Sequence, residues 1–418
     1  MSARLGLTGV ACPDHSRLLA HGRQSPPPSA VPKAPHMTTT LQSLDPALLP
    51  EGVRARFVPR VNGLNVHLLE AGRPGDPCLL LLHGFPEIAY SWRRVMGTLA
   101  DAGYYVIAPD LRGYGRTTGW FADYEADLSP WRPTNLARDA VGLIYALGYR
   151  SVAAVIGHDF GSPVAAWSTL LRPDIFRSVA LMSAPFGGAP AVPFDTLTNP
   201  PPPPPEPINA ALARLARPRK HYHHYYARRE ANSEIMNATQ GLHDFLRAYY
   251  HYKSGDWVQN KPHPIAGWTA EALAEIPTYY IMDLDRTMPE TVAPEMPKPE
   301  EIAANTWLPD SALAVYTEEY RRNGFQGGLQ WYRVTTTGVY VGEQELFTGC
   351  TIDVPSLFLS GSRDWGVYQT PGAFERMQKE ACTRMLICEL IDGAGHWPQQ
   401  EKPEETVALL LRFLKEQR

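Results

Sequence analysis

One short segment carries a carboxylate between two glycines. Residues 157–161 read Gly-His-Asp-Phe-Gly, and they follow an apolar run at residues 152–156. Glycines at this spacing permit the sharp turn between a strand and a helix that presents a nucleophile in the pattern G-x-S-x-G, but here Asp159 stands in the place of the serine. The alternative is that Asp159 only caps the following helix. The apolar run before the turn and the small residues after it favour the nucleophile.

Two further residues complete a set that can activate water. Asp364 follows the apolar run at residues 356–360, and His396 lies on a glycine-rich loop after the run at residues 385–391. Taken alone, Asp364 would be interpreted as a turn residue and His396 as a surface residue. The order of nucleophile, acid and histidine along the chain is that of the α/β-hydrolase fold. We therefore predict that Asp364 orients His396 and that His396 acts as a base.

A third segment predicts an oxyanion hole. The residues after the apolar run at residues 78–82 read His-Gly-Phe-Pro, from His83 to Pro86. In this fold, the loop after such an early strand supplies one backbone N–H to the hole, and the residue after the nucleophile supplies the other. The predicted donors are therefore the N–H groups of Phe85 and Phe160.

An aspartate in place of serine selects a different reaction. Its reference pKa is about 3.9, so Asp159 is ionised at neutral pH and needs no base for its attack. A carboxylate can displace a leaving group from a saturated carbon and form an alkyl ester. His396, held by Asp364, would then activate a water that attacks the carbonyl carbon of Asp159. Epoxides and alkyl halides are the substrates that suit this sequence of steps.

The leaving group separates these two substrates. An epoxide releases an alkoxide that needs an O–H donor such as tyrosine, whereas a halide needs N–H donors, and the side chain of Phe160 has none. Candidate donors are Tyr222, Tyr225 and Tyr226 in one cluster and Tyr332 in another, although most tyrosines are only packed aromatics. The three histidines beside Tyr222 lack acidic or cysteine partners nearby, so we predict no metal site and no cofactor.

The elements that must position these residues form an interrupted α/β pattern. Continuous apolar runs alternate with amphipathic helices, which predicts a mostly parallel sheet with helices on both faces. We divide the chain into a disordered proline-rich extension (1–48), a first core part (49–186), a helical cap (187–340) and a second core part (341–418). Within the cap, residues 208–226 are predicted to be helical, and no strand is evident.

Composition excludes several partners and leaves others open. The formal net charge of −4 predicts no nucleic-acid binding, and no apolar run is long enough for stable membrane insertion. Five scattered cysteines favour reduced thiols and a cytoplasmic location. Residues 1–40 hold four basic residues and one acidic residue, a weak signal for import into an organelle. The oligomeric state is left open, with a homodimer as one option.

Several motifs together resemble the α/β-hydrolase-fold epoxide hydrolases, especially the soluble fungal and microbial type. They are HGFPE, YSWR, APDLRGYG, GHDFG, GFQGGLQWYR and GHWPQQEKPEE, and the resemblance extends from about residue 50 to the end. It implies a two-step mechanism, a helical cap and two cap tyrosines that bind the epoxide oxygen. By motif these are Tyr222 and Tyr332, with Tyr225 as the second choice for the first position. The resemblance also suggests that Glu87 helps to order the hydrolytic water.

The expected function is therefore hydrolysis of a small-molecule epoxide to a vicinal diol. Many members of the family have tryptophan after the nucleophile where this chain has Phe160, which weakens the alternative of a dehalogenase with the same fold. A biosynthetic cyclase, in which a substrate hydroxyl replaces water, is a second alternative. A ligand-binding protein without catalysis is the third, but such a protein would not need the acid, the base, the hole and both tyrosines.

Overall fold

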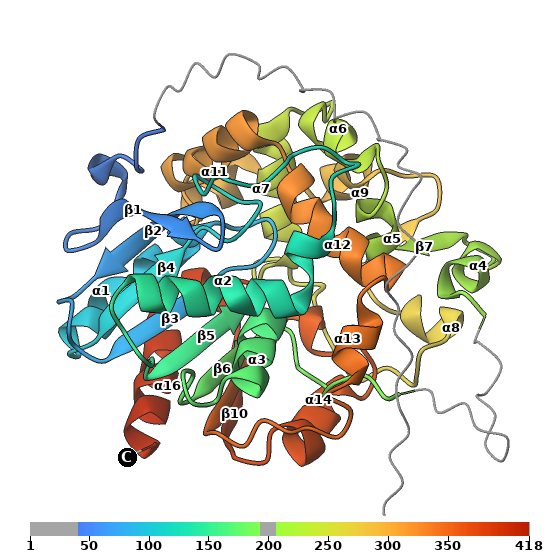
Figure 1. Ribbon diagram of the computed structural model, residues 1–418. Coiled ribbons are helices and arrows are strands. Elements are labelled where there is room, and N and C mark those ends of the chain that lie inside the picture. Colours follow the sequence, from blue (N-terminus) through green and yellow to red (C-terminus); the bar gives the residue numbers. More distant parts are fainter. Residues whose placement is uncertain (1–40, 193–205, 418) are drawn as a thin grey trace, which may run out of the picture. The chain divides into compact units, whose positions relative to one another are not determined.

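The computed structural model describes residues 41–192 and 206–417. Its centre is a sheet of eight strands in the order β1-β2-β4-β3-β5-β6-β9-β10, drawn as arrows in Figure 1. The strands are β1 (Arg54–Val61), β2 (Leu64–Ala71), β3 (Cys78–Leu82), β4 (Tyr105–Pro109), β5 (Ala154–His158), β6 (Val179–Met182), β9 (Ser356–Gly361) and β10 (Met385–Ile391). Within this sheet β2 is antiparallel to both of its neighbours, β1 and β4, and every other pair of neighbouring strands is parallel. The predicted mostly parallel sheet is confirmed.

Helices cover both faces of the sheet. The helices α2 (Pro133–Ala146) and α3 (Gly161–Leu171) pack together on one face, and α1 (Arg93–Asp101) packs with α16 (Pro403–Glu416) on the other (Figure 1). Strands β3 to β6 and β9 are buried along their whole length, which explains their continuous apolar runs. The parallel strands end at one edge, and the segments after β3, β5, β9 and β10 carry the predicted catalytic residues.

A mainly helical segment separates β6 from β9. Its helices are α4 (Ile208–Ala213), α5 (Tyr222–Tyr226), α6 (Ala231–Met236), α7 (Leu242–Lys253), α8 (Ala270–Leu273), α9 (Met288–Val292), α10 (Pro299–Ala304), α11 (Asp310–Asn323), α12 (Gln326–Thr337) and α13 (Val341–Glu345). We call this segment the cap. In the described part of the chain, no helix is both long and apolar enough to cross a membrane.

Two predictions for the cap were wrong. The segment predicted to be helical over residues 208–226 consists of α4, the short strand β7 (Arg219–His221) and α5. Pro218 lies between α4 and β7, and a proline inside a helix removes a hydrogen bond and clashes with the preceding turn. The strand β7 pairs antiparallel with β8 (Ile281–Asp283), so the cap also contains a small sheet.

The predicted disordered extension, residues 1–48, extends too far toward the C-terminus. Residues 41–48 are described, and Leu44 is 4% exposed. The N–H of Leu44 donates to Nε2 of His67 on β2 at 3.2 Å, so apolar burial and a hydrogen bond fix this part against the sheet. Residues 1–40 and 193–205 lie outside the described residues.

Candidate active site

Asp159 lies on the sharp turn between β5 and α3. Its φ of 51° is in the left-handed region, which a residue with a side chain adopts only under local constraint. The two flanking glycines are required by close backbone packing. A Cβ on Gly157 would lie 2.1 Å from the carbonyl oxygen of Gly161, and a Cβ on Gly161 would lie 2.2 Å from that of Leu82. The turn therefore presents the carboxylate at the edge of the sheet.

The structure brings the other two predicted residues to this carboxylate. Nδ1 of His396 lies 3.0 Å from Oδ1 of Asp364, and Nε2 lies 3.3 Å from Oδ2 of Asp159. Asp364 also accepts hydrogen bonds from the N–H of Gly366 at 2.7 Å and the hydroxyl of Ser360 at 2.8 Å. The imidazole thus stands between two buried carboxylates, one held by neighbours and one facing the cavity.

The predicted oxyanion donors flank the other oxygen of the nucleophile. The N–H of Phe85 donates to Oδ1 of Asp159 at 2.8 Å. A Cβ on Gly84 would lie 2.3 Å from the Cβ of Asp159, so only glycine lets the two segments approach this closely. Among the described residues, the N–H of Phe160 donates to no acceptor, and it precedes the first turn of α3. Such a group is available for a negative charge that develops on the carboxylate.

The charges of the site keep Asp159 ionised. Burial alone would raise the pKa of Asp159, but the nearby imidazole of His396 and the charge of Lys253 lower the pKa overall. Burial and Lys253 lower the pKa of His396, whereas the carboxylates of Asp364 and Asp159 raise it by more, so the net pKa of His396 is raised.

A cavity of about 540 Å³ opens over Asp159, between the core and the cap. Its lining includes Tyr222 and Phe160 and is otherwise rich in tryptophan. The ring of Tyr332 lies 4.6 Å from that of Phe160 and 5.8 Å from that of Tyr222. The hydroxyl of Tyr222 donates to Oε1 of Gln369 at 3.0 Å. Tyr222 therefore lines the cavity over the nucleophile. Tyr332 is not part of this lining, but its ring packs against two residues that are, Phe160 and Tyr222.

Tyr225, the second choice for the first tyrosine, lies elsewhere. Its ring packs under Lys220 and Arg228, at 5.4 and 5.2 Å from their charged ends, and it is not part of the cavity lining. Tyr222 lines the cavity, whereas Tyr225 packs against these two cations, so Tyr222 is the better placed of the two for the first position.

The histidines beside Tyr222 serve as cavity walls. His221 and His223 both line the cavity, and burial lowers the pKa of His223 to about 4, so its ring is neutral. In the described ranges, no group of three or more histidine, cysteine, aspartate or glutamate side chains is placed to hold a metal ion.

The chain is similar to known enzymes over most of its length. A family model described as the alpha/beta hydrolase fold matches residues 77–403. Epoxide hydrolase A of Mycobacterium tuberculosis is 32% identical over 367 residues, which cover 84% of this chain and 95% of that protein. An epoxide hydrolase of Caballeronia sordidicola is 30% identical over 354 residues, which cover 85% of this chain and 92% of that protein. The chain belongs to the epoxide hydrolases of the α/β-hydrolase family.

Solved structures agree with this assignment. The epoxide hydrolase from an endophytic Streptomyces superposes with a TM-score of 0.69 at 29% identity, covering 88% of this chain and 96% of that one. Epoxide hydrolase A from Mycobacterium thermoresistibile superposes with a TM-score of 0.65 at 31% identity, covering 88% and 99%.

One buried pair in this epoxide hydrolase was not found from the sequence. Nδ1 of His158, the residue before the nucleophile, lies 2.6 Å from Oε2 of Glu87, and Nε2 lies 2.6 Å from the carbonyl oxygen of His396. The other oxygen of Glu87 accepts from Gln399 and Gln400, both at 3.0 Å. Glu87 therefore reaches the site through His158, and its part in ordering the hydrolytic water stays a prediction.

The remaining supporting residues hold the loop that carries Phe85. Nδ1 of His83 lies 2.9 Å from the carbonyl oxygen of Gly84, and Nε2 accepts from the N–H of Leu111 at 3.0 Å. The carbonyl oxygen of Pro86 accepts from the hydroxyl of Tyr250 at 3.1 Å, which joins this loop to the cap helix α7.

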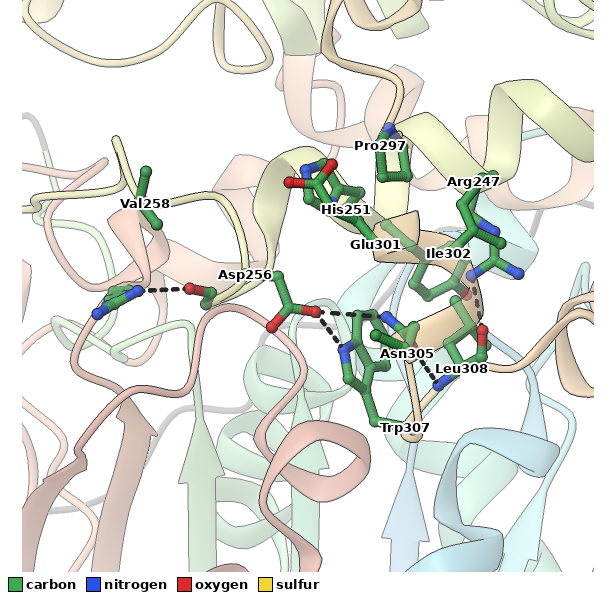
Figure 2. Close-up of a pocket in the computed structure, with 14 residues that line it drawn as sticks. Arg247, His251, Asp256, Val258, Pro297, Glu301, Ile302, Asn305, Trp307 and Leu308 are labelled. Carbon is green, nitrogen blue, oxygen red and sulfur yellow. Dashed lines mark hydrogen bonds between the residues drawn. The ribbon is translucent and has the colours of Figure 1, made fainter. Parts of the chain in front are cut away.

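A second cavity of about 370 Å³ lies at the end of α7 and contains none of the predicted catalytic residues. Figure 2 shows Asp256 in this cavity, where its Oδ2 accepts from Trp307 at 2.8 Å and from Asn305 at 3.3 Å. The carbonyl oxygen of Gly255 accepts from Arg363 at 2.6 Å. The polar groups of this cavity are thus largely bonded to one another.

Proposed function

We propose that this enzyme opens an epoxide to a vicinal diol through an alkyl ester on Asp159. The observation that carries the proposal is the different surroundings of the two oxygens of Asp159. Oδ1 accepts from the N–H of Phe85 at 2.8 Å, whereas Oδ2 lies 3.3 Å from Nε2 of His396. One oxygen is therefore held in the hole, and the other remains for the attack.

In the first step, Oδ2 of Asp159 attacks a carbon of the epoxide ring. The bond from this carbon to the ring oxygen breaks, and the oxygen takes a proton from Tyr222 or Tyr332. Burial and the charge of Asp159 raise the pKa of both phenols well above its usual value, so each phenol holds its proton in the free enzyme. Within the described residues the hydroxyl of Tyr332 makes no hydrogen bond, so it can donate to the substrate.

In the second step, His396 takes a proton from a water molecule that attacks Cγ of Asp159. Negative charge then develops on Oδ1, which the N–H groups of Phe85 and Phe160 are placed to stabilise. The bond from Cγ to the ester oxygen breaks and the diol leaves. The proton held by His396 and the second proton of the water, which is then on the carboxyl group of Asp159, return to the diol oxygen and to the phenolate, so that Asp159 is again a carboxylate. Asp364 supports the imidazolium, since its Oδ1 lies 3.0 Å from Nδ1.

A single turnover in water enriched in oxygen-18 tests this proposal. Excess enzyme is mixed with a styrene-oxide-type epoxide, and both the diol and the peptide that contains Asp159 are analysed by mass spectrometry. The expected result is an unlabelled first-turnover diol and one heavy oxygen in the carboxylate, because water attacks the aspartyl carbonyl. A heavy oxygen in the first-turnover diol would show direct attack of water on the epoxide and would overturn the covalent route. Asp159→Ala is the control, and it should give no diol.

A further inference from the structure

The cap helix α7 ends in a lysine that the reaction described above does not use. Lys253 is the last residue of α7 and is 2% exposed, although a lysine is almost never fully buried without a partner. Within residues 41–192 and 206–417, its ammonium group makes no ion pair. A buried charge without a direct partner is costly to the folded state, so its presence calls for an explanation.

Aromatic rings enclose this ammonium group. Nζ lies 4.7 Å from the ring centre of Tyr280, 5.4 Å from those of Tyr249 and Trp397, and 5.9 Å from that of Tyr279. The faces of such rings attract a cation, most strongly where water is excluded. The enclosure therefore keeps a cation in place without neutralising its charge.

The enclosure is directly attached to the candidate active site. The carbonyl oxygen of Lys253 accepts from the N–H of His396 at 2.9 Å. The ring of Trp397 lies 4.5 Å from that of His396, and the ring of Tyr280 lies 4.9 Å from that of Tyr222. The lysine thus touches the residues that hold both the base and one phenol.

Carboxylates of the site act on Lys253 from the core side. Burial lowers its pKa, and the charges of Asp159, Asp364 and Glu87 raise it, with a net value of about 8. In return, Lys253 lowers the pKa of Asp159 and of His396. The ammonium group and the catalytic groups therefore respond to each other's charges.

We propose that Lys253 is a positioning residue of the reaction. Its buried ammonium group opposes protonation of His396 and stabilises the negative charge that develops on Oδ1 of Asp159 when water attacks the ester. This inference rests on the proposed two-step function. The effect belongs to the second step, in which the charge of Asp159 has been removed by esterification and His396 lies between the charges of Lys253 and Asp364.

The sign of the pH dependence follows from these charges. His396 must be neutral to accept a proton from water, so hydrolysis of the ester fails as the pH falls below the pKa of His396. A nearby cation lowers the pKa of His396, so removal of the cation raises this pKa. The acid limb, which is the part of the pH–rate profile where ester hydrolysis slows as the pH falls, then moves to higher pH. The titratable or charged groups that face His396 or Lys253 are Asp159, Asp364, Glu87, His158, Tyr249, Tyr279 and Tyr280.

The test compares Lys253→Met with Lys253→Arg by rapid mixing across pH, so that formation and hydrolysis of the ester are followed separately. We expect Lys253→Met to move the acid limb of hydrolysis upward by about one pH unit, the lower end of the effect of a close charge. Lys253→Arg keeps the cation and should leave the limb within a few tenths of a unit. Slower hydrolysis with an unmoved limb in Lys253→Met would show a purely structural role and overturn the proposal.

A matched control removes a charge from the same segment outside the site. Asp256 lies three residues after Lys253 and faces the second cavity (Figure 2). Asp256→Asn should therefore leave the acid limb unmoved, and a shift equal to that of Lys253→Met would contradict a specific role for the lysine. If the wild-type enzyme forms no ester, the proposed function itself fails. If an ester forms but the pH dependence of its hydrolysis is the same with and without Lys253, only the proposal for Lys253 fails.

A second measurement does not depend on the folding of Lys253 variants. In His396→Gln the ester should accumulate, and the pKa of Lys253 can be followed by NMR of 15N-labelled lysine side chains before and after addition of epoxide. We expect this pKa to fall on esterification, because the charge of Asp159 raises it in the free enzyme. An unchanged pKa would overturn the proposal.

Discussion

The two walls of the active-site cavity are built in different ways. On the core side, backbone groups hold the carboxylates. The N–H of Phe85 donates to Asp159 at 2.8 Å, and the N–H of Gly366 donates to Asp364 at 2.7 Å. Asp159 follows the buried strand β5 directly, and Asp364 lies three residues after the end of the buried strand β9, so the sheet fixes both positions.

On the cap side, rings hold the functional hydroxyls. The ring of Tyr332 lies 4.7 Å from that of Tyr226 and 5.3 Å from that of Phe85. Tyr222 adds one hydrogen bond, to Gln369 at 3.0 Å. Ring packing is less directional than backbone hydrogen bonds, and the two tyrosines can share one task. We therefore expect substitutions in the core to stop a step and substitutions in the cap to change its rate.

The largest expected effect tests the core side. His396→Gln removes the base but leaves the nucleophile and the hole in place, so the ester should form and remain. Turnover should fall by at least about 10⁴-fold, as for the removal of one member of a catalytic triad. Mass spectrometry of the intact protein after addition of epoxide should show one equivalent of covalent adduct. Lost turnover without an adduct would mean that His396 also acts before the ester, and the division between the steps would be wrong.

The same contrast explains what the sequence could predict. Asp159 could be predicted because its two flanking glycines and the preceding apolar run are local in the chain. Asp364 and His396 could be predicted because each follows an apolar run in the expected order. In every case the signal lies within a few residues of the functional group, and the parallel sheet brings the strand ends to one edge.

Other features have no such local signal. Lys253 and His158 acquire their surroundings from segments far away in the chain, and neither residue type is unusual at its place.

Pro218, in contrast, is a local signal in the sequence, since it breaks the segment predicted to be one helix into α4, β7 and α5. Tyr222 and Tyr225 could not be separated by sequence, because the phase of a one-turn helix depends on its packing.

A cap substitution of intermediate effect tests whether the phenols share their task. Tyr332→Phe removes one O–H donor but keeps the ring packing, so formation of the ester should slow by about 10²-fold, the lower end for general acid catalysis, while hydrolysis of the ester changes little. Rapid mixing separates the two rates. Tyr225→Phe is the control, because the ring of Tyr225 packs against Lys220 and Arg228 and not against Phe160, so loss of its hydroxyl should leave both rates unchanged. An unchanged rate of ester formation in Tyr332→Phe would remove that phenol from the first step.

The smallest expected effect concerns the partner of Tyr222 and has the opposite direction. In the free enzyme the phenol donates to Oε1 of Gln369, and it must leave this acceptor to donate to an epoxide oxygen. Gln369→Leu removes the competing acceptor, and a hydrogen bond of this kind contributes about 1 kcal/mol, so kcat/KM should rise about fivefold. The gain should vanish in the double variant with Tyr222→Phe, because no donor is then released. A fall in kcat/KM would instead show that Gln369 orients the phenol, and the cap wall would then depend on directional hydrogen bonds as the core wall does.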